Sequence, residues 1–373
     1  MEAPIFSAED VKRAALSGVT RVTANDIDAT FKSNYIDLIS KPLGSSILAL
    51  SDEWFAGAEN LTVPTPPVRK PGVFTYAGAW YDGWETRRHN RQPNESDPYD
   101  WVIFRLGVAS GKVKGVEVDT AFFSGNHAPE VEVEGCFIED GDQTKEEAVK
   151  DVSFKDWEVI LPRQECGPSQ RFAWILEQMT GKAYTHIRLK MFPDGGIARF
   201  RLFGEVVAVL PKALDASFDL AATVNGGVAV QCSDQHFGTK DNLLLPGRGV
   251  DMGDGWETKR SRGAHVDWVI IRLGTSGIIN KVVVDTAHFR GNFPQKVQLF
   301  AAAASSNGQA PKHEDADAWV EILPPQATGP DKEHEYPGSV LSNTQGKKYG
   351  FVKLVIIPDG GVKRIRVYGS KGE

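Results

Sequence analysis

The chain has 373 residues and a formal net charge of −7, with a pI near 5.7. This acidic balance argues against nucleic acid or an anionic membrane as the main partner, because both carry negative charge. The three cysteines form no Cys-x-x-Cys pair, which argues against structural zinc and against a disulfide framework. No stretch approaches the ~20 apolar residues of a membrane span, and no signal peptide is recognisable.

The first half of the chain alternates short apolar runs with turn residues. Residues 7–16 predict a short N-capped helix, and residues 47–52 predict a strand. The nearly continuous apolar run at 101–106 is typical of a buried strand. The strict alternation at 116–119 and 131–134 predicts half-exposed strands.

The next stretch predicts one helix and two further strands. Residues 171–179 are a helix candidate. Residues 185–191 and 198–203 predict strands, and the Pro-Asp-Gly-Gly sequence at 193–196 between them predicts a hairpin turn. Many short strands with few helices are typical of an all-β sandwich.

Most of these segments occur twice, in the same order. Asp-Gly-Trp-Glu-Thr-Arg-Arg at 82–88 returns at 254–260 with one Lys-for-Arg exchange. Three further blocks also recur: 100–107 as 267–274, 119–126 as 285–292, and 193–196 as 358–361. We therefore predict a tandem duplication with two domains. The first covers residues 1–204, including an N-terminal extension, and the second covers residues 205–373, including a linker.

The repeated Trp-Glu block supplies the first candidate site residues. A Gly after Asp makes a turn, and the following Trp is expected to anchor the loop to the core. Glu85, Arg87 and Arg88 then lie together between two strands. The arginine fork suits a carboxylate or ureido oxygen, while Glu accepts N–H groups or moves a proton. The alternative is a structural ion pair that holds the loop in both copies.

The block that begins at Asp119 supplies the second set. It brings Asn126 and His127 in the first copy, and His288 and Asn292 in the second. The asparagines are alternatively explained as residues that tolerate a left-handed turn. His89 and His127 have no histidine at the matching positions of the second copy, and His288 has none in the first. Each is a candidate acid or base, against the commoner role of a surface or capping residue.

Several familiar catalytic motifs are missing from the sequence. It contains no Gly-x-Ser-x-Gly elbow, no phosphate-binding loop, no dinucleotide fingerprint and no His-Glu-x-x-His. Composition and spacing alone therefore predict a two-domain β protein with charged loop rims, and they do not indicate a reaction.

The duplicated blocks resemble the allantoicases, or allantoate amidinohydrolases, over essentially the whole chain. The resemblance rests on the paired blocks at 82–88 and 254–260 and on the two that follow each of them. It implies two tandem jelly-roll domains of the galactose-binding-like type. It also implies an enzyme that hydrolyses allantoate to ureidoglycolate and urea in purine degradation, and that assembles into homo-oligomers. We expect it in the cytoplasm; the family also occurs in peroxisomes, but the C-terminal Lys-Gly-Glu is not a peroxisomal address.

The implied reaction needs an acid/base pair, a clamp for a carboxylate and groups that hold ureido N–H. We therefore expect catalytic roles for Glu85, His89 and His127. We expect substrate-binding roles for eight further residues: Arg87, Arg88, Asn126, Asp119, Glu257, Arg260, His288 and Asn292. No metal ligands are assigned and no cofactor is firmly implied, and a divalent metal stays open.

Two other interpretations are compatible with the sequence. The chain could be a non-catalytic jelly-roll module that binds a sugar or a small polar ligand. Exposed aromatic platforms without acid/base partners would favour that function. Alternatively, one copy catalyses and the other serves as an assembly surface, as the different histidines of the two copies suggest.

Overall fold

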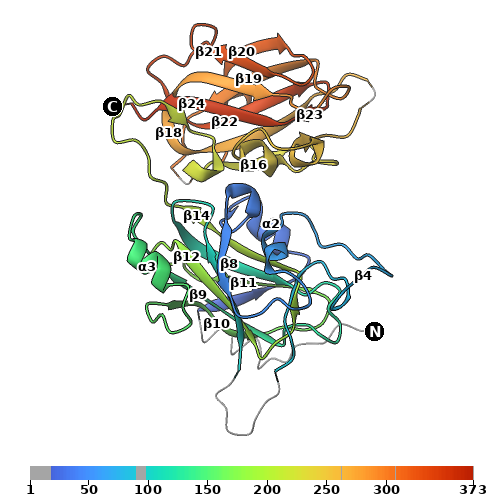
Figure 1. Cartoon of the computed structure of the whole chain (residues 1–373). Helices are drawn as coiled ribbons and strands as arrows, with labels where there is room; N and C mark the ends of the chain where they lie inside the picture. The colour runs from blue at the N-terminus through green and yellow to red at the C-terminus, as the bar shows by residue number, and fades with distance from the viewer. Residues whose placement is uncertain (1–17, 90–97, 262, 307, 373) are drawn as a thin grey trace. The chain divides into compact units, whose positions relative to one another are not determined.

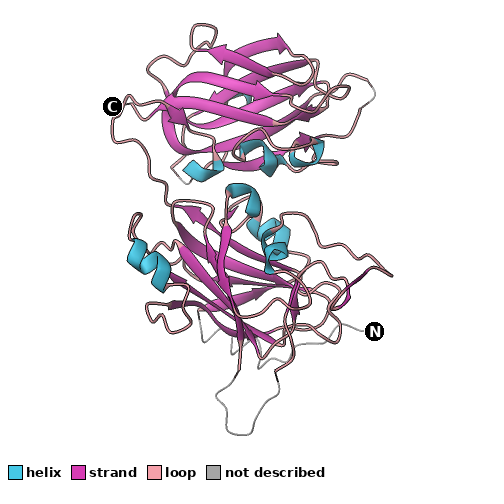
Figure 2. Cartoon of the chain, viewed as in Figure 1, coloured by secondary structure: helices cyan, strands magenta, loops and turns pink. Residues whose placement is uncertain are grey.

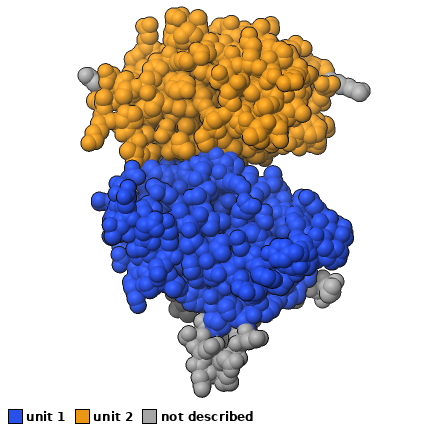
Figure 3. All heavy atoms as spheres, in the orientation of Figure 1, with its two compact units in different colours: residues 1–207 blue, residues 208–373 orange. Residues whose placement is uncertain are grey.

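A computed structural model describes residues 18–89, 98–261, 263–306 and 308–372. The chain divides into two compact units, Met1–Val207 and Ala208–Glu373 (Figure 3). Strands dominate both units (Figures 1 and 2). The helix expected at 7–16 lies outside the described residues. Within the described part, no helix is long and apolar enough to cross a membrane.

The first unit is a sandwich of two five-stranded antiparallel sheets. One sheet has the order β1 (Val19–Val22), β11 (Arg171–Leu176), β8 (Gly111–Asp119), β14 (Arg199–Val206) and β2 (Ile36–Asp37). The other has the order β10 (Glu158–Glu165), β9 (Glu130–Cys136), β12 (His186–Phe192), β7 (Asp100–Arg105) and β3 (Ser46–Leu50). The core lies between the two sheets, where the ring centroids of Phe104 and Phe200 are 5.7 Å apart.

Short helices complete the first unit. They are α2 (Ile27–Phe31), α3 (Gln143–Ala148), η1 (Lys41–Leu43) and η2 (Ala58–Thr62), and a small hairpin pairs β4 (Phe74–Thr75) with β5 (Gly78–Ala79). Helix α2 covers the outer face of the first sheet, where Ile27 and Phe31 pack with Ala173 and Phe203. This cover buries a sheet face that would otherwise meet water.

The second unit has the same two layers, joined by one long strand. Strand β18 (Asp267–Asp285) pairs in its first part with β16 (Val228–Cys232) and β22 (Lys348–Ile357). Its last part pairs with β24 (Arg364–Ser370) and β21 (Glu333–Pro337). The remaining elements are β15 (Phe218–Asp219), β19 (Lys296–Ala302), β20 (Val320–Ala327), η3 (Thr223–Asn225), η4 (Lys240–Leu244), η5 (Met252–Asp254) and η6 (Ala316–Ala318). The expected class, two tandem jelly-roll sandwiches, is confirmed.

A two-stranded sheet closes the loop rim of each unit. In the first, β6 (Trp84–Glu85) pairs with β13 (Gly196–Ile197); in the second, β17 (Trp256–Glu257) pairs with β23 (Gly361–Val362). Both tryptophans are fully buried. Their indole N–H groups donate to the carbonyls of Asp52 (2.7 Å) and Asp234 (2.8 Å). The buried tryptophan therefore holds each loop against its core, as expected.

The close approach of these strands requires glycine. A Cβ added at Gly196 would lie 2.2 Å from a ring carbon of Phe123, and one at Gly83 would lie 2.6 Å from the carbonyl oxygen of Ile197. Neither the packed ring nor the backbone can move away at small cost. The repeated glycines are thus explained by steric contact at the rim.

Three expectations about secondary structure were wrong. Residues 171–176 form strand β11, because tertiary pairing with β1 and β8 overrides the local helical pattern. Strands β12 and β14 belong to different sheets, so 193–196 crosses between layers and forms no hairpin. Residues 116–119 are buried rather than half-exposed, because Glu117 is paired with Arg171 at 2.6 Å and α2 covers this sheet.

A buried ion pair fastens the start of each rim loop to the last strand. Arg199 is 2% exposed, and its guanidinium donates to Asp82 through Nη1 (3.0 Å) and Nη2 (2.8 Å). In the second unit, Arg364 donates to Asp254 through Nη2 at 3.2 Å. The first residue of the repeated Asp-Gly-Trp-Glu block therefore has a structural role in both copies.

We expect Arg199→Met to lower the free energy of unfolding by about 3 kcal/mol, because it leaves the largely buried Asp82 carboxylate without its partner. Equilibrium unfolding in urea measures this loss. Arg87→Met is the control, since Arg87 pairs with Asp52 while its side chain stays 65% exposed, and we expect it to cost less than about 1 kcal/mol. Equal losses for the two variants would contradict the structural role of Arg199.

Candidate active site

Glu85 is the central carboxyl group of the rim in the first unit. It lies on β6 opposite Gly196 and is 9% exposed. The Nδ2 group of Asn126 donates to Glu85 Oε1 at 2.6 Å. Burial raises the pKa of Glu85, while the Asn126 hydrogen bond and the charge of Arg88 oppose this rise. The result is a carboxyl group that holds a proton more tightly than an exposed glutamate.

Arg88 lies beside this carboxyl group and is held in place by the Pro-Asp-Gly-Gly segment. Its Nη1 donates to Asp194 Oδ1 at 2.7 Å and its Nη2 donates to the carbonyl of Gly125 at 3.1 Å. The side chain is still 54% exposed. Arg88 therefore keeps donors that can reach a ligand while its orientation is fixed.

Asp194 also orients the neighbouring histidine. Its Oδ2 accepts the backbone N–H of His89 at 2.7 Å. The His89 ring then points to Asp100, with Nε2 3.1 Å from Asp100 Oδ2, and the hydroxyl of Ser51 donates to Asp100 Oδ1 at 2.7 Å. Sequence reasoning assigned no role to Asp194, Asp100 or Ser51. The recurrence of the aspartates in both copies was the available signal.

His127 completes the cluster on the other side of Gly196. The two residues form a parallel β-bridge. Burial lowers the pKa of His127, and the charge of Arg88 acts in the same direction, against a backbone contact with Ser124. Its Nδ1 is buried and makes no hydrogen bond of good geometry with the described residues. The surroundings of His127 therefore favour the neutral form of its imidazole over the charged form.

Two predicted site residues in this unit have their own partners. Arg87 donates to Asp52 through its backbone N–H (2.8 Å) and its Nε (3.0 Å), and its guanidinium lies over Trp54 at 5.3 Å. Asp119 ends β8 and accepts the N–H of Ala121 at 2.8 Å. Neither side chain is hydrogen-bonded to Glu85, Asn126 or Arg88 within the described residues. Their predicted substrate-binding roles stay predictions.

The second unit repeats part of this arrangement. Asn292 Nδ2 donates to Glu257 Oε1, as Asn126 does to Glu85. Asp359 Oδ2 accepts the N–H of Ser261 at 2.7 Å, as Asp194 does for His89. Arg260 is exposed, and no hydrogen bond or ion pair joins it to another residue of the described part. The carboxylate and amide pair is thus common to both units, whereas the arginine contacts differ.

His288 occupies a strained turn next to Asp331. Its φ is 68°, like the 72° of the matching Phe122, so the turn and not the side chain is common to both copies. Its N–H donates to Asp331 Oδ1 at 2.8 Å, and Arg290 pairs with the same carboxylate. Its predicted substrate-binding role stays a prediction.

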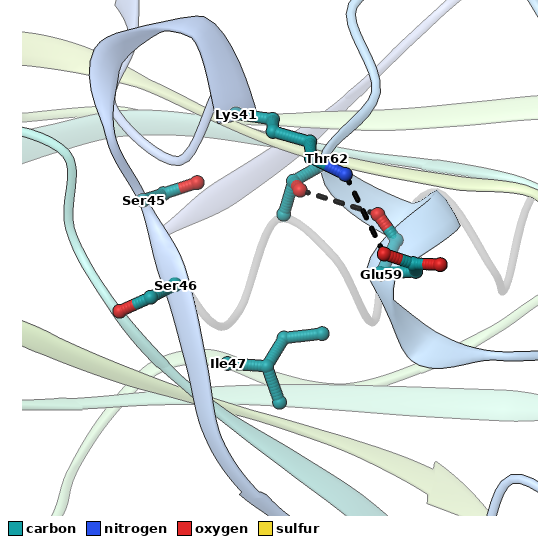
Figure 4. Close-up of a pocket in the computed structure, with 6 residues that line it drawn as sticks. All are labelled: Lys41, Ser45, Ser46, Ile47, Glu59 and Thr62. Atoms are coloured by element: carbon teal, nitrogen blue, oxygen red, sulfur yellow. Dashed lines mark hydrogen bonds and ion pairs between the residues drawn. The ribbon is translucent and has the colours of Figure 1, made fainter.

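A shallow pocket lies away from these residues. It has a volume of about 190 Å³ and is lined by Lys41, Ser45, Ser46, Ile47, Glu59 and Thr62 (Figure 4). Lys41 Nζ lies 3.5 Å from Glu59 Oε2, so the two charges neutralise each other. None of the predicted site residues lines it. Among the described residues, no group of three or more His, Cys, Asp or Glu side chains is placed to hold a metal ion.

Fold and rims together define a class: a duplicated jelly-roll protein whose loops gather carboxylate, amide, guanidinium and imidazole groups. Comparison with known proteins then identifies the family. The allantoicase repeat model matches residues 36–207 and 218–372. The chain belongs to the allantoicase family.

Individual relatives agree with this assignment. The allantoicase of Neurospora crassa is 59% identical, over 94% of this chain and 96% of that protein. A probable allantoicase of Schizosaccharomyces pombe is 50% identical, over 96% of this chain and 99% of that protein. The crystal structure of the Saccharomyces cerevisiae allantoicase superposes with a TM-score of 0.78 at 46% identity, covering 94% of this chain and 99% of that one.

The environment of Glu85 leads to a prediction about Asn126. We expect Asn126→Ala to raise the pKa of Glu85 further, because the donor that stabilises the ionised form is lost. A ¹³C NMR titration of the glutamate carboxyl signals, with Glu85→Gln to assign the peak, measures this. Asn292→Ala, the matching change in the other unit, should leave the Glu85 titration unchanged. A lowered or unchanged pKa in Asn126→Ala would refute the interpretation.

Proposed function

We propose that the protein hydrolyses allantoate to ureidoglycolate and urea in the degradation of allantoin, and that the Glu85 rim is an active site. Membership of the allantoicase family, with relatives named allantoicase at 50% identity or more, supports the activity. The cluster of Glu85, Asn126, Arg88 and His89 supports the place. A cytoplasmic homo-oligomer stays an expectation from the sequence.

The chemistry determines which groups such a site needs. Allantoate is a carbon that bears one carboxylate and two ureido groups, and the product has a hydroxyl group where one urea left. The bond that breaks is therefore the C–N bond at the central carbon. An acid protonates the departing nitrogen, the other ureido nitrogen supplies electrons to form an iminium, and water activated by a base adds to it.

The first rim offers one residue for each of these tasks. Arg88, oriented by Asp194 but half exposed, binds the substrate carboxylate. Glu85 takes the proton from the attacking water, since burial makes it a stronger base than an exposed carboxylate.

The two histidines have separate roles at the ureido groups of the substrate. His89 donates the proton to the departing urea, with the Asp100 carboxylate orienting the ring. The neutral His127 accepts a ureido N–H. The amide oxygen of Asn126 is available for another N–H, because its nitrogen is used by Glu85.

The alternative of a pure binding module has one observation in its favour. Trp54 and Tyr76 are exposed and their rings meet edge-on at 5.8 Å. However, Arg87 lies over Trp54, and the acid/base groups of Glu85 and His89 belong to the same loop. Aromatic rings with such partners do not favour simple carbohydrate binding, and the chain belongs to a family of enzymes.

Glu85 and His89 fill the base and acid roles of the proposed mechanism, so we expect urea release from allantoate to survive removal of metals. Purified protein treated with EDTA should release urea at the same rate with and without added divalent metal. A colorimetric urea assay makes the measurement, and the untreated protein is the control. Release that appears only with metal would keep the enzyme and overturn the metal-free assignment.

We expect the double variant Glu85→Gln with Glu257→Gln to lose about 10²- to 10⁴-fold in kcat, because it removes the proposed base together with the matching carboxylate of the second rim. Circular dichroism checks that it is folded. Glu59→Gln, in the pocket of Figure 4, changes an exposed glutamate of the first unit and should keep the parental rate. A folded double variant with normal turnover would place the site elsewhere.

A further inference from the structure

Both units bring a serine and a histidine to the matching buried aspartate at the rim, although the oxygens contacted differ. In the first, Ser51 and His89 contact the two oxygens of Asp100 at 2.7 and 3.1 Å. In the second, the hydroxyl of Ser233 donates to Asp267 Oδ1 at 2.7 Å, and His265 Nε2 lies 3.0 Å from the same oxygen. An imidazole thus reaches the matching aspartate in each unit.

The two histidines do not match each other in the sequence. The residue that corresponds to His89 is Ser261, so aligning the two copies does not single out His265. His89 precedes Asp100 by 11 residues, whereas His265 precedes Asp267 by two. Duplication explains the shared aspartate and serine. Duplication does not explain why the second imidazole comes from the other end of the loop. This difference indicates a separate requirement for an imidazole at the aspartate.

The exposure of the two pairs supports a chemical role. The aspartate side chains are 4% and 2% exposed, and the histidine side chains are 37% and 38% exposed. A buried carboxylate that holds one ring nitrogen leaves the rest of the ring facing solvent at a fixed angle. This is the arrangement of an oriented acid or base.

The second rim also supplies the other groups that the reaction needs. Glu257 accepts a hydrogen bond from Asn292, and it is less buried than Glu85. Arg260 is exposed and unpaired among the described residues, so its guanidinium is available to a carboxylate. The one missing group is a second imidazole, since Phe293 replaces His127.

We propose that the second unit carries a second active site, in which His265, oriented by Asp267, is a catalytic acid. Its substrate class is the same as that of the first site, a ureido compound with a carboxylate, so the inference rests on the proposed function. The His265 imidazolium gives its proton to the departing urea nitrogen as the C–N bond breaks. Glu257 takes a proton from water as the C–O bond forms, and proton exchange with solvent restores both residues.

Glu85→Gln, which disables the first site, provides the test. We expect this variant to keep about half of the wild-type rate of urea release, and adding His265→Ala should lower the remainder about 100-fold. Added imidazole in the buffer should restore part of that loss, which no structural role of His265 would allow. His236→Ala, an exposed histidine of the same unit, should change nothing in this background.

Three results distinguish the possible failures. If the wild-type protein releases urea but Glu85→Gln alone does not, and His265→Ala alone keeps the full rate, the second site does not exist while the proposed function stands. The inference is also overturned if adding His265→Ala to the folded Glu85→Gln variant leaves its residual rate of urea release unchanged. If the wild-type protein releases no urea from allantoate, the proposed function fails and the second site fails with it.

Discussion

The contact on which both rims depend is the pairing of a two-residue strand with a glycine from the crossing segment. Gly196 can pair with Glu85 while the ring of Phe123 packs against it only because it has no Cβ, since a Cβ there would overlap that ring. The buried indole of Trp84 fixes the strand by donating a hydrogen bond to the carbonyl of Asp52. The Asp82–Arg199 ion pair fixes the start of the loop. Steric fit, apolar burial and a buried ion pair thus all stabilise the position of this short segment. The carboxyl group of Glu85 is consequently held in one position by its surroundings.

Burial also shifts the pKa values of two side chains at the rim. Glu85 and His127 lie on either side of Gly196, and both are partly withdrawn from water. Desolvation raises the pKa of the acid and lowers the pKa of the imidazole, so each group moves toward its neutral form. Arg88 pushes both pKa values downward, opposing desolvation at Glu85 and reinforcing it at His127. One buried environment therefore shifts the pKa values of these two side chains in opposite directions.

The duplication shows which features belong to the fold and which to the chemistry. The buried tryptophans, the aspartate–arginine anchors and the close-packed glycines are present in both copies at matching positions. The imidazoles are not at matching positions, yet each unit brings one to the buried aspartate at the start of its strand, β7 or β18. Differences in arginine pairing and burial then distinguish the two rims. This pattern supports the proposal of two related sites.

The sequence alone determined the duplication, the all-β class and the residue types of the rim, because these follow from repeated letters and local periodicity. The family followed from the resemblance of the repeated blocks to the allantoicases. The sequence also named Glu85, Arg88, Asn126 and His89, which the structure brings together. Only the tertiary structure showed that 171–176 is a strand, that 193–196 crosses between sheets, and that Asp52 holds Arg87 away from Glu85's hydrogen-bonded cluster. It alone revealed His265 on Asp267. Local pattern cannot predict such pairings, since they depend on which distant segments the folded layers bring into contact.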